Sequence, residues 1–141
     1  MDYQTARQLL IEGTYGVLAT VGADGMPYGV PLSYIAEGHR LYFHGADHGH
    51  KLKNLAHNPR ATFTVIANAE MSPAQYTILY RSVIAFGEVH TVTDPEEKRA
   101  VMQKVCAKYG APADPVHIGA ALPRTAVLCM EVEYLSGREN A

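Results

Sequence analysis

The stretch that decides the fold is residues 41–59, LYFHGADHGHKLKNLAHNP. Its first four residues alternate aromatic and apolar side chains, which predicts a strand over 41–44. Two glycines then mark a turn over 45–49. A helix is expected over His50–His57, closed by Asn58-Pro59, because the residue before a proline avoids the helical region. The sequence therefore predicts a strand, a glycine-containing turn and a short helix in direct succession.

The beginning of this expected helix is suited to an anion. The free N–H groups of a first helical turn point outward, and the helix dipole favours negative charge there. Lys51 lies in that turn, where a cation is unfavourable unless an anion such as a phosphate lies between it and the helix.

Helical geometry separates the two lysines of this segment. At about 100° per residue, Leu52, Leu55 and Ala56 share the face that should be buried. Lys51 flanks that face, whereas Lys53 points more nearly away. We therefore expect Lys51 to contact a ligand and Lys53 to contact solvent. The alternative is that both lysines only make a connector soluble.

The composition predicts one domain that contacts neither nucleic acid nor membrane. The chain has 141 residues, and its net charge is −2 with no basic run. The N-terminus is polar, and no run approaches the ~20 apolar residues of a membrane span. Cys106 and Cys129 are far apart and form no CxxC, which is typical of free thiols in a reducing cytoplasm. We expect a cytoplasmic protein with a single domain over residues 1–141.

The segment before residue 41 predicts a helix followed by a hairpin. Asp2 can cap a first helix that ends at Gly13. Strands are expected over 15–21 and 27–35, joined by a tight turn. Pro31 removes a ladder donor, so its strand is expected at a sheet edge or with a bulge, which leaves backbone groups free for a ligand. A merely irregular edge is the alternative.

Three more strands are expected after residue 59. The first covers 60–67, a polar loop follows over 68–77, and the second is a long strand over 78–92 that bends at Gly87. The last covers 125–135 and precedes a frayed tail. The residues expected on the core face of this last strand are Ala126, Leu128, Met130, Val132 and Tyr134.

The remaining segment predicts a capped helix and a loop. Asp94, followed by a proline and two glutamates, is a strong helix start, and Gly110 is the expected stop. A loop is expected over 111–123. Six strands with only two or three helices to cover their apolar face favour closure into a small antiparallel barrel, which removes sheet edges.

Four short motifs carry a resemblance to a known family. They are G-x-P-x-x-x-P-L at 25–32, Y-F-H-G-A at 42–46, G-H-K at 49–51 and S-V-I-x-F-G at 82–87. With the sequence around them, residues 15–109 resemble the flavin-binding split-barrel superfamily of pyridoxamine 5′-phosphate oxidase. The nearest pattern is that of the 5-nitroimidazole-resistance (Nim) branch. The resemblance implies a mostly β fold, an antiparallel six-stranded split barrel of the FMN-binding type with flanking helices.

The resemblance also implies a homodimer with two FMN sites at the subunit interface. The cofactor-binding residues are then expected from three segments of one subunit and one segment of the other. The first group comprises Val30, Pro31, Leu32 and Ser33 at the ring and ribityl chain, His44, Gly45 and Ala46 along the cofactor, and His50 and Lys51 at its phosphate. The second group, from the neighbouring subunit, comprises Arg81, Ser82 and Val83.

His44 is the candidate catalytic residue, because an imidazole at a strand end beside the ring could donate a proton to a reduced substrate. The alternative is a hydrogen bond to the backbone. No metal site is expected from His44, His48 and His50, since their spacing does not suit one helical face and no cysteine or glutamate is near.

The function implied is an FMN-dependent oxidoreductase that passes electrons from a nicotinamide donor to a small oxidised molecule such as a nitro compound. The alternatives are a haem-binding protein and a non-catalytic flavin-binding or sensory module, and a deazaflavin could replace FMN. The segments 68–77 and 111–123 match nothing specific in the family and are expected to shape the substrate pocket.

Overall fold

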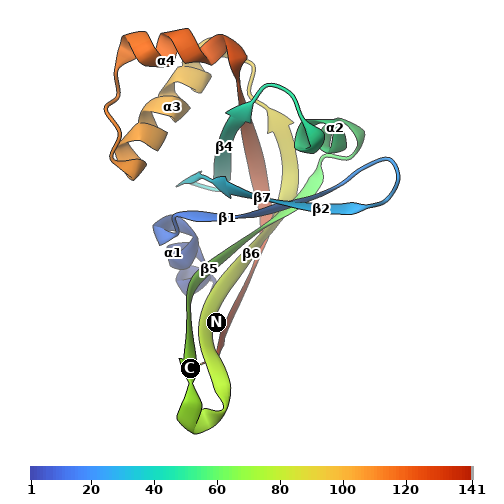
Figure 1. Ribbon diagram of the computed structural model, residues 1–141, viewed down its shortest axis with the longest axis vertical. Helices are drawn as coiled ribbons and strands as arrows, with labels where there is room; N and C mark the ends of the chain where they lie inside the picture. The colour runs from blue at the N-terminus through green and yellow to red at the C-terminus, as the bar shows by residue number, and fades with distance from the viewer. Residues whose placement is uncertain (141) are drawn as a thin grey trace.

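A seven-stranded antiparallel sheet forms the body of the protein in the computed structural model, which describes residues 1–140 (Figure 1). The strand order is β2-β1-β5-β6-β7-β4-β3. The strands are β1 (Tyr15–Val21), β2 (Pro27–Ser33), β3 (Ile35–Glu37), β4 (Arg40–Ala46), β5 (Arg60–Ser72), β6 (Thr77–Thr91) and β7 (Thr125–Asn140). The helices are α1 (Tyr3–Glu12), α2 (His50–His57), α3 (Pro95–Tyr109) and α4 (Pro115–Ala121), with 3-10 turns η1 (Pro73–Gln75) and η2 (Leu122–Arg124). The fold is the predicted mostly β split barrel with flanking helices, built from seven strands where six were expected.

The extra strand comes from a break in the predicted return strand. β2 ends at Ser33 and β3 begins at Ile35, so only Tyr34 separates them. Nevertheless, the two strands lie at opposite ends of the sheet order, β2 beside β1 and β3 beside β4. The chain itself therefore joins the two edges and closes the barrel. The expectation for Pro31 is confirmed, since β2 is an edge strand that pairs only with β1.

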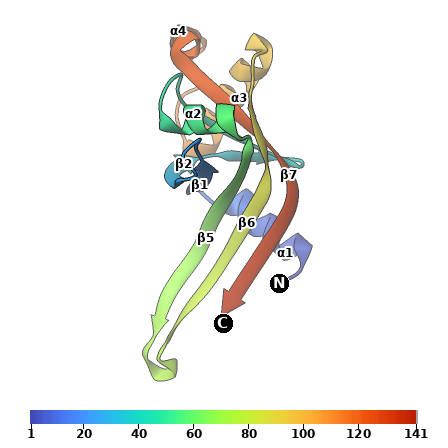
Figure 2. The ribbon, with the colours of Figure 1, turned by 90° about the vertical axis from the view of Figure 1, so that its right-hand side faces the viewer.

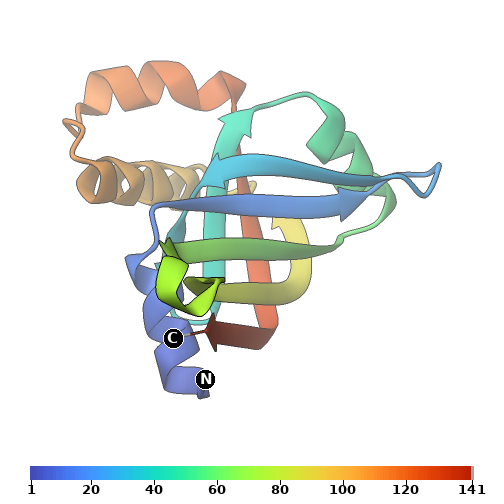
Figure 3. The ribbon, with the colours of Figure 1, turned by 60° about the horizontal axis from the view of Figure 1, so that its bottom comes forward.

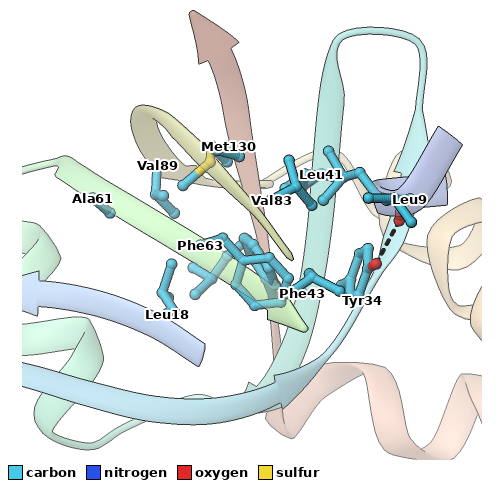
Figure 4. Packing of buried hydrophobic residues seen from close by; sticks show 14 of the residues in the cluster. Leu9, Leu18, Tyr34, Leu41, Phe43, Ala61, Phe63, Val83, Val89 and Met130 are labelled. Atoms are coloured by element: carbon cyan, nitrogen blue, oxygen red, sulfur yellow. Dashed lines mark hydrogen bonds between the residues drawn. The ribbon is translucent and has the colours of Figure 1, made fainter. Parts of the chain in front are cut away.

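The core lies inside the barrel and is centred on aromatic side chains (Figure 4). Phe63 contacts Phe43 and Tyr34, each with a ring centroid 4.8 Å away, in the tilted and edge-on arrangements that aromatic rings prefer. All three side chains are fully buried, and each such burial contributes roughly 1.5–3 kcal/mol. The hydroxyl of Tyr34 donates to the carbonyl of Leu10, which fixes α1 against the barrel.

A bulge in β7 changes which side chains face the core. Phe86 lies opposite Tyr134 but Gly87 lies opposite Val132, so Glu133 is an extra residue in the ladder. The irregularity lies opposite Gly87, where β6 was expected to bend, but the extra residue belongs to β7. The prediction for Tyr134 was wrong, because the bulge shifts the alternation by one residue and leaves this side chain 61 % exposed, while Leu135 packs against the core.

The predicted loop over 68–77 and the predicted frayed tail were both wrong. β5 continues to Ser72, only η1 and Tyr76 separate it from β6, and β7 pairs with β6 as far as Asn140. Figure 2 shows the paired ends of β5 and β6 extending away from the barrel as an arm. Cross-strand pairing, which is not visible in any isolated segment, holds these polar residues in strands. Residue 141 lies outside the described residues.

Two of the helix caps were predicted and a third was missed. Asp2 accepts a hydrogen bond from the amide of Thr5, and Asp94 accepts one from the amide of Glu96, as expected. The predicted loop over 111–123 instead contains α4, whose start is capped by Asp114. Helices α3 and α4 lie side by side over one end of the barrel (Figures 1 and 3). None of the helices within residues 1–140 has both the length and the apolar character needed to cross a bilayer.

Candidate functional site

The end of β4 and the start of α2 form an open strand–turn–helix junction. β4 runs to Ala46, two residues beyond the predicted strand, and α2 covers the predicted residues. Gly49 precedes the helix with a φ of 131°, a conformation that favours glycine, and no side chain caps the first turn. The first-turn amides are thus available to an anion, as the sequence predicts.

Helix α2 is fixed to the barrel by a face that differs in part from the predicted one. Leu55 is buried, but Ala56 is exposed, and Asn54 is buried in its place. The side-chain amide of Asn54 donates to Oγ1 of Thr20 on β1 at 3.0 Å, so a polar residue contributes to the buried face. This hydrogen bond joins α2 to β1.

Lys51 turns back over the end of β4. A β carbon placed on Gly45 would lie 3.1 Å from Nζ of Lys51, so the ammonium occupies the space that the glycine leaves open. Lys51 is half-buried, whereas Lys53 is exposed. The structure thus brings together Lys51, Gly45 and the free end of α2, and it separates the two lysines as helical geometry predicts.

His50 is positioned by an aromatic stack. Its ring lies on the ring of Tyr28 with centroids 4.1 Å apart and an interplanar angle of 12°. Tyr28 belongs to β2, so this contact connects the first residue of α2 with the strand that carries Pro31. The edge of the imidazole, with its ring nitrogens, stays available for a hydrogen bond.

His44 lies at the other side of the junction, half-buried on β4 opposite Val127. Its Nδ1 atom is buried and has no hydrogen-bond partner within the described part of the chain. Burial lowers the pKa of His44, because desolvation disfavours the charged imidazolium. An unpaired buried nitrogen is costly, and a ligand beside it would remove that cost.

A cavity of about 580 Å³ lies between the barrel and the α3–α4 pair. His44 and Ser33 line its barrel side, so two of the predicted site residues meet there. Most of the opposite wall is apolar, and Asp114, which caps α4 through the amide of Val116, is the one acidic residue. Within residues 1–140 no lysine or arginine lines this cavity. Its apolar lining residues are Met102, Val105, Ala111, Pro112, Ile118, Ala121 and Leu122.

Three cavity residues from α3 and α4 were missed as site residues by sequence reasoning. Cys106, Tyr109 and His117 all line the cavity, together with the residues of the segment 111–123 that was expected to shape a substrate pocket. The signal that could have placed His117 is Asp114 followed by proline, the same helix start as at Asp94.

The other predicted cofactor residues on β2 and β4 lie around the junction. Val30 and Leu32 pack in part against the core, so mainly their backbone is available on the outer side of the edge strand. Pro31 and Ala46 are exposed.

The segment predicted to come from a neighbouring subunit lies away from the cavity. The Nε atom of Arg81 is 3.4 Å from a carboxylate oxygen of Glu139 on β7. Ser82 borders a different groove, next to Ile66, and the side chain of Val83 is fully buried in its own core. Within one chain, none of the three residues lines the cavity at His44.

The protein is thus a closed antiparallel split barrel with an open strand–turn–helix junction and a mainly apolar cavity. The sequence profile of the pyridoxamine 5′-phosphate oxidase family matches residues 2–139, and the chain belongs to this family. No curated protein sequence matches the chain.

Solved structures share the fold at low sequence identity. A candidate 5-nitroimidazole antibiotic resistance protein from Bacteroides thetaiotaomicron has a TM-score of 0.83 and 22 % identity, over 96 % of this chain and 82 % of that one. An FAD-binding protein from Mesorhizobium loti has a TM-score of 0.74 and 24 % identity, over 100 % of this chain and 96 % of that one. An FAD- and haem-binding protein from Mycobacterium smegmatis has a TM-score of 0.75 and 21 % identity, over 99 % of this chain and 71 % of that one.

Proposed function

We propose that the protein is an FMN-dependent oxidoreductase that reduces a small oxidised molecule, such as a nitro compound, with electrons from a nicotinamide donor. The observation that carries this proposal is the position of the Lys51 ammonium over Gly45, beside the uncapped first turn of α2. Such a combination of a cation and free amides suits the phosphate of a flavin mononucleotide. The names of two structural relatives, which bind FAD, support a flavin here.

The residues at the junction fit the rest of such a cofactor. Lys51, His50 and the first-turn amides of α2 would hold the phosphate. The backbone of the edge strand at Pro31 would lie along the ring, since an edge strand has unpaired amides and carbonyls. The other contacts proposed from this subunit are Val30, Leu32, Ser33, His44, Gly45 and Ala46.

A bound flavin supplies the redox chemistry, and the protein supplies binding, orientation and electrostatics. We assign the handling of a proton to His44, whose Nδ1 atom is unpaired at the cavity wall. Its lowered pKa favours the neutral imidazole near pH 7, which can accept a proton or a hydrogen bond from a substrate. It can donate a proton only after it has been protonated.

The cavity next to His44 is the proposed substrate site. Its volume of about 580 Å³ suits a small planar molecule, and its walls are mainly apolar. Because Asp114 is the only Asp, Glu, Lys or Arg among the lining residues within positions 1–140, an uncharged substrate fits better than a carboxylate or a phosphate.

We further propose a homodimer, with a second copy of the chain covering the arm formed by β5 and β6. Large apolar side chains are exposed along this arm, with Ile66 65 %, Met71 67 % and Tyr76 96 % accessible. An apolar patch of this kind is typical of an interaction surface. Arg81 and Ser82 lie where this arm begins on β6. They would therefore lie against the surface of a second copy docked on the arm.

The absorption spectrum of the purified protein, before and after addition of FMN, tests the cofactor. We expect flavin bands, quenching of FMN fluorescence on binding, and bleaching by NADH or NADPH under anaerobic conditions. Protein that stays colourless and binds neither FMN nor FAD contradicts the proposal. Flavin that binds but is never reduced supports a sensory module in place of an enzyme.

Haem binding is the second candidate, favoured by the unpaired Nδ1 atom of His44 and by the haem-binding relative. Imidazole is a common axial ligand of haem iron. A Soret band that is lost in the His44→Ala variant would support this alternative, whereas failure to take up haem would exclude it.

A further inference from the structure

A group of metal-ligand side chains lies outside the cavity and outside the proposed flavin site. His90 on β6 and Cys129 on β7 are direct partners in the antiparallel ladder. Glu131 is two residues beyond Cys129 and therefore points to the same face of β7. One ligand atom from each of these three side chains lies within 4.8 Å of the other two. None of the three lines the cavity at His44.

The three ligand types match those that zinc prefers. Cysteine sulfur, imidazole nitrogen and carboxylate oxygen all bind Zn²⁺, at about 2.0–2.3 Å. In a tetrahedron with such bonds the ligand atoms are roughly 3.3–3.8 Å apart. The ligand atoms must therefore approach one another by at most about 1–1.5 Å. His90 is exposed and Glu131 is half-exposed, so both can rotate, while Cys129 is fully buried and fixed.

Glu131 is already oriented by two neighbours, His39 in the β3–β4 turn and Arg40 at the start of β4. His39 Nε2 lies 2.9 Å from one carboxylate oxygen, and Arg40 Nε lies 2.9 Å from the other. Hydrogen bonds to a metal-ligating carboxylate fix its direction in this way in known sites.

The backbone beside Glu131 is held close to β6. A β carbon on Gly87 would lie 2.0 Å from the carbonyl oxygen of Glu131, so only glycine permits this approach. The two strands that carry the three ligand side chains are therefore tightly joined where the bulge begins.

Further carboxylates offset the positive charge of Arg40 in this region. Glu88 lies opposite Glu131 in the ladder. Glu97 on α3 accepts a hydrogen bond of 3.2 Å from the hydroxyl of Tyr42, and Tyr42 lies opposite Cys129. Three carboxylates and one guanidinium around the group make the position favourable for a divalent cation.

We propose that His90, Cys129 and Glu131 bind one Zn²⁺ ion per chain, with water as the fourth ligand. The thiol proton of Cys129 leaves to solvent when the sulfur binds the metal. Three protein ligands and one water form an open site of the kind that zinc adopts in proteins. The ion would connect β6 to β7 at the bulge and stabilise the folded chain. This proposal is independent of the flavin.

Equilibrium dialysis against Zn²⁺, with metal analysis of the retained protein, tests the site. We expect one zinc per chain and a higher unfolding temperature with the metal. Replacing the exposed ligand, His90→Ala, should lower zinc affinity at least ~10-fold, because mutation of a residue that only hydrogen-bonds to a metal ligand already lowers metal affinity by about this factor. It should also reduce the rise in unfolding temperature at a given zinc concentration. His57→Ala, which changes an exposed histidine on α2, is the matched control and should bind zinc like the wild type.

Cobalt substitution tests the sulfur ligand directly. The Co²⁺ complex should show the near-ultraviolet absorption of a thiolate–cobalt bond, and this band should be lost in Cys129→Ser but kept in Cys106→Ser. Absence of retained zinc, equal retention by His90→Ala, or a cobalt spectrum without the thiolate band would each overturn the proposal. Because His90 is exposed, the His90→Ala variant tests the site even if Cys129→Ser does not fold.

Discussion

Lys51 and Lys53 are two residues apart on α2, and their surroundings differ. The ammonium of Lys51 lies over Gly45 at the open junction, whereas Lys53 is exposed. We expect Lys51→Ala to weaken FMN binding by about 1.5–3 kcal/mol, the range for a hydrogen bond to a charged group. Lys53→Ala should have little effect. Fluorescence titration of both variants measures this difference, and equal losses would refute the assignment of the phosphate to Lys51.

The half-buried imidazole of His44 makes stability depend on pH. Burial lowers its pKa in the folded state below the unfolded value of about 6.5, so the unfolded chain binds the proton more readily. The contribution of His44 to the free energy of unfolding is therefore constant above about pH 6.5. It becomes destabilising as the pH falls toward the lowered pKa of the folded state.

We expect the cofactor-free His44→Gln variant to lose less thermal stability than the wild type between about pH 7 and about pH 5. Unfolding temperatures measured across this range test the expectation. The exposed His57 supplies the control, since His57→Gln should keep the wild-type dependence. An identical pH profile for His44→Gln and the wild type would show that this group does not contribute.

At the scale of single residues, the sequence predicts what is local. Lys51 could be chosen because its helix, its glycine turn and its buried face all lie within residues 41–59. The group of His90, Cys129 and Glu131 could not be found in this way. Its members come together only through the pairing of β6 with β7, and about forty residues separate His90 from Cys129.

At the scale of elements, the same helix-start signal occurs twice in the sequence, but only its first occurrence led to a predicted helix. Asp-Pro starts both α3 and α4, and the caps at Asp94 and Asp114 accept equivalent hydrogen bonds of 3.1 and 3.0 Å. α4 was missed because the segment around it is short and rich in proline and glycine. The arm of β5 and β6 is a different case, because pairing with the neighbouring strand, and not intrinsic preference, keeps its polar residues extended.

Gly87 is the glycine at which an added β carbon would meet its neighbour at the shortest distance, which gives a prediction at this scale. A β carbon there would meet the backbone oxygen of Glu131 at 2.0 Å, so Gly87→Ala must move one of the strands. We expect a loss of stability of about 1–3 kcal/mol, as for other overpacked sites. Urea denaturation measures this loss.

Gly119 in α4 is the matched control. A β carbon there would meet nothing closer than Arg99 at 3.8 Å, and alanine favours the helix. Gly119→Ala should therefore be neutral or stabilise the protein by up to about 1 kcal/mol. If Gly87→Ala were tolerated equally well, the close approach of the strands would not be a constraint on the sequence.

At the scale of the whole molecule, the sequence predicted a closed antiparallel barrel correctly, because six apolar strand patterns with few helices favour closure. It did not locate the closure point. The alternation of side chains continues through Tyr34, so the pattern over 27–35 is that of one strand, although β2 and β3 belong to opposite edges. Only the change of pairing partner separates the two strands.

The proposed homodimer predicts a change of mass when the arm is made polar. Met71 is 67 % exposed on β5, so Met71→Glu should leave the fold intact while placing charge in the proposed interface. We expect sedimentation to show a dimer for the wild type and a monomer for this variant. FMN affinity should fall in parallel, because Arg81 and Ser82 would no longer reach the neighbouring site.

Val116→Glu, at an exposed apolar position on α4, is the corresponding control and should remain dimeric. A wild-type protein that is monomeric in sedimentation and binds FMN fully would contradict both the dimer and the shared site.

The single residue between β2 and β3 has a consequence for the order of folding. Tyr34 is anchored by the hydroxyl of Tyr109, 75 residues later in the chain, which contacts both its amide at 3.0 Å and its carbonyl at 2.9 Å. The hairpin of β5 and β6 forms between strands that are neighbours in the sequence. The contact of Tyr109 with Tyr34 joins residues far apart in the chain, so it carries a larger loop-closure cost and is expected later. We expect amides of β3 to gain protection from hydrogen exchange after those of β5 and β6 during refolding. The strands of the barrel would therefore pair first as an open sheet, and closure at Tyr34 would be the last step of folding.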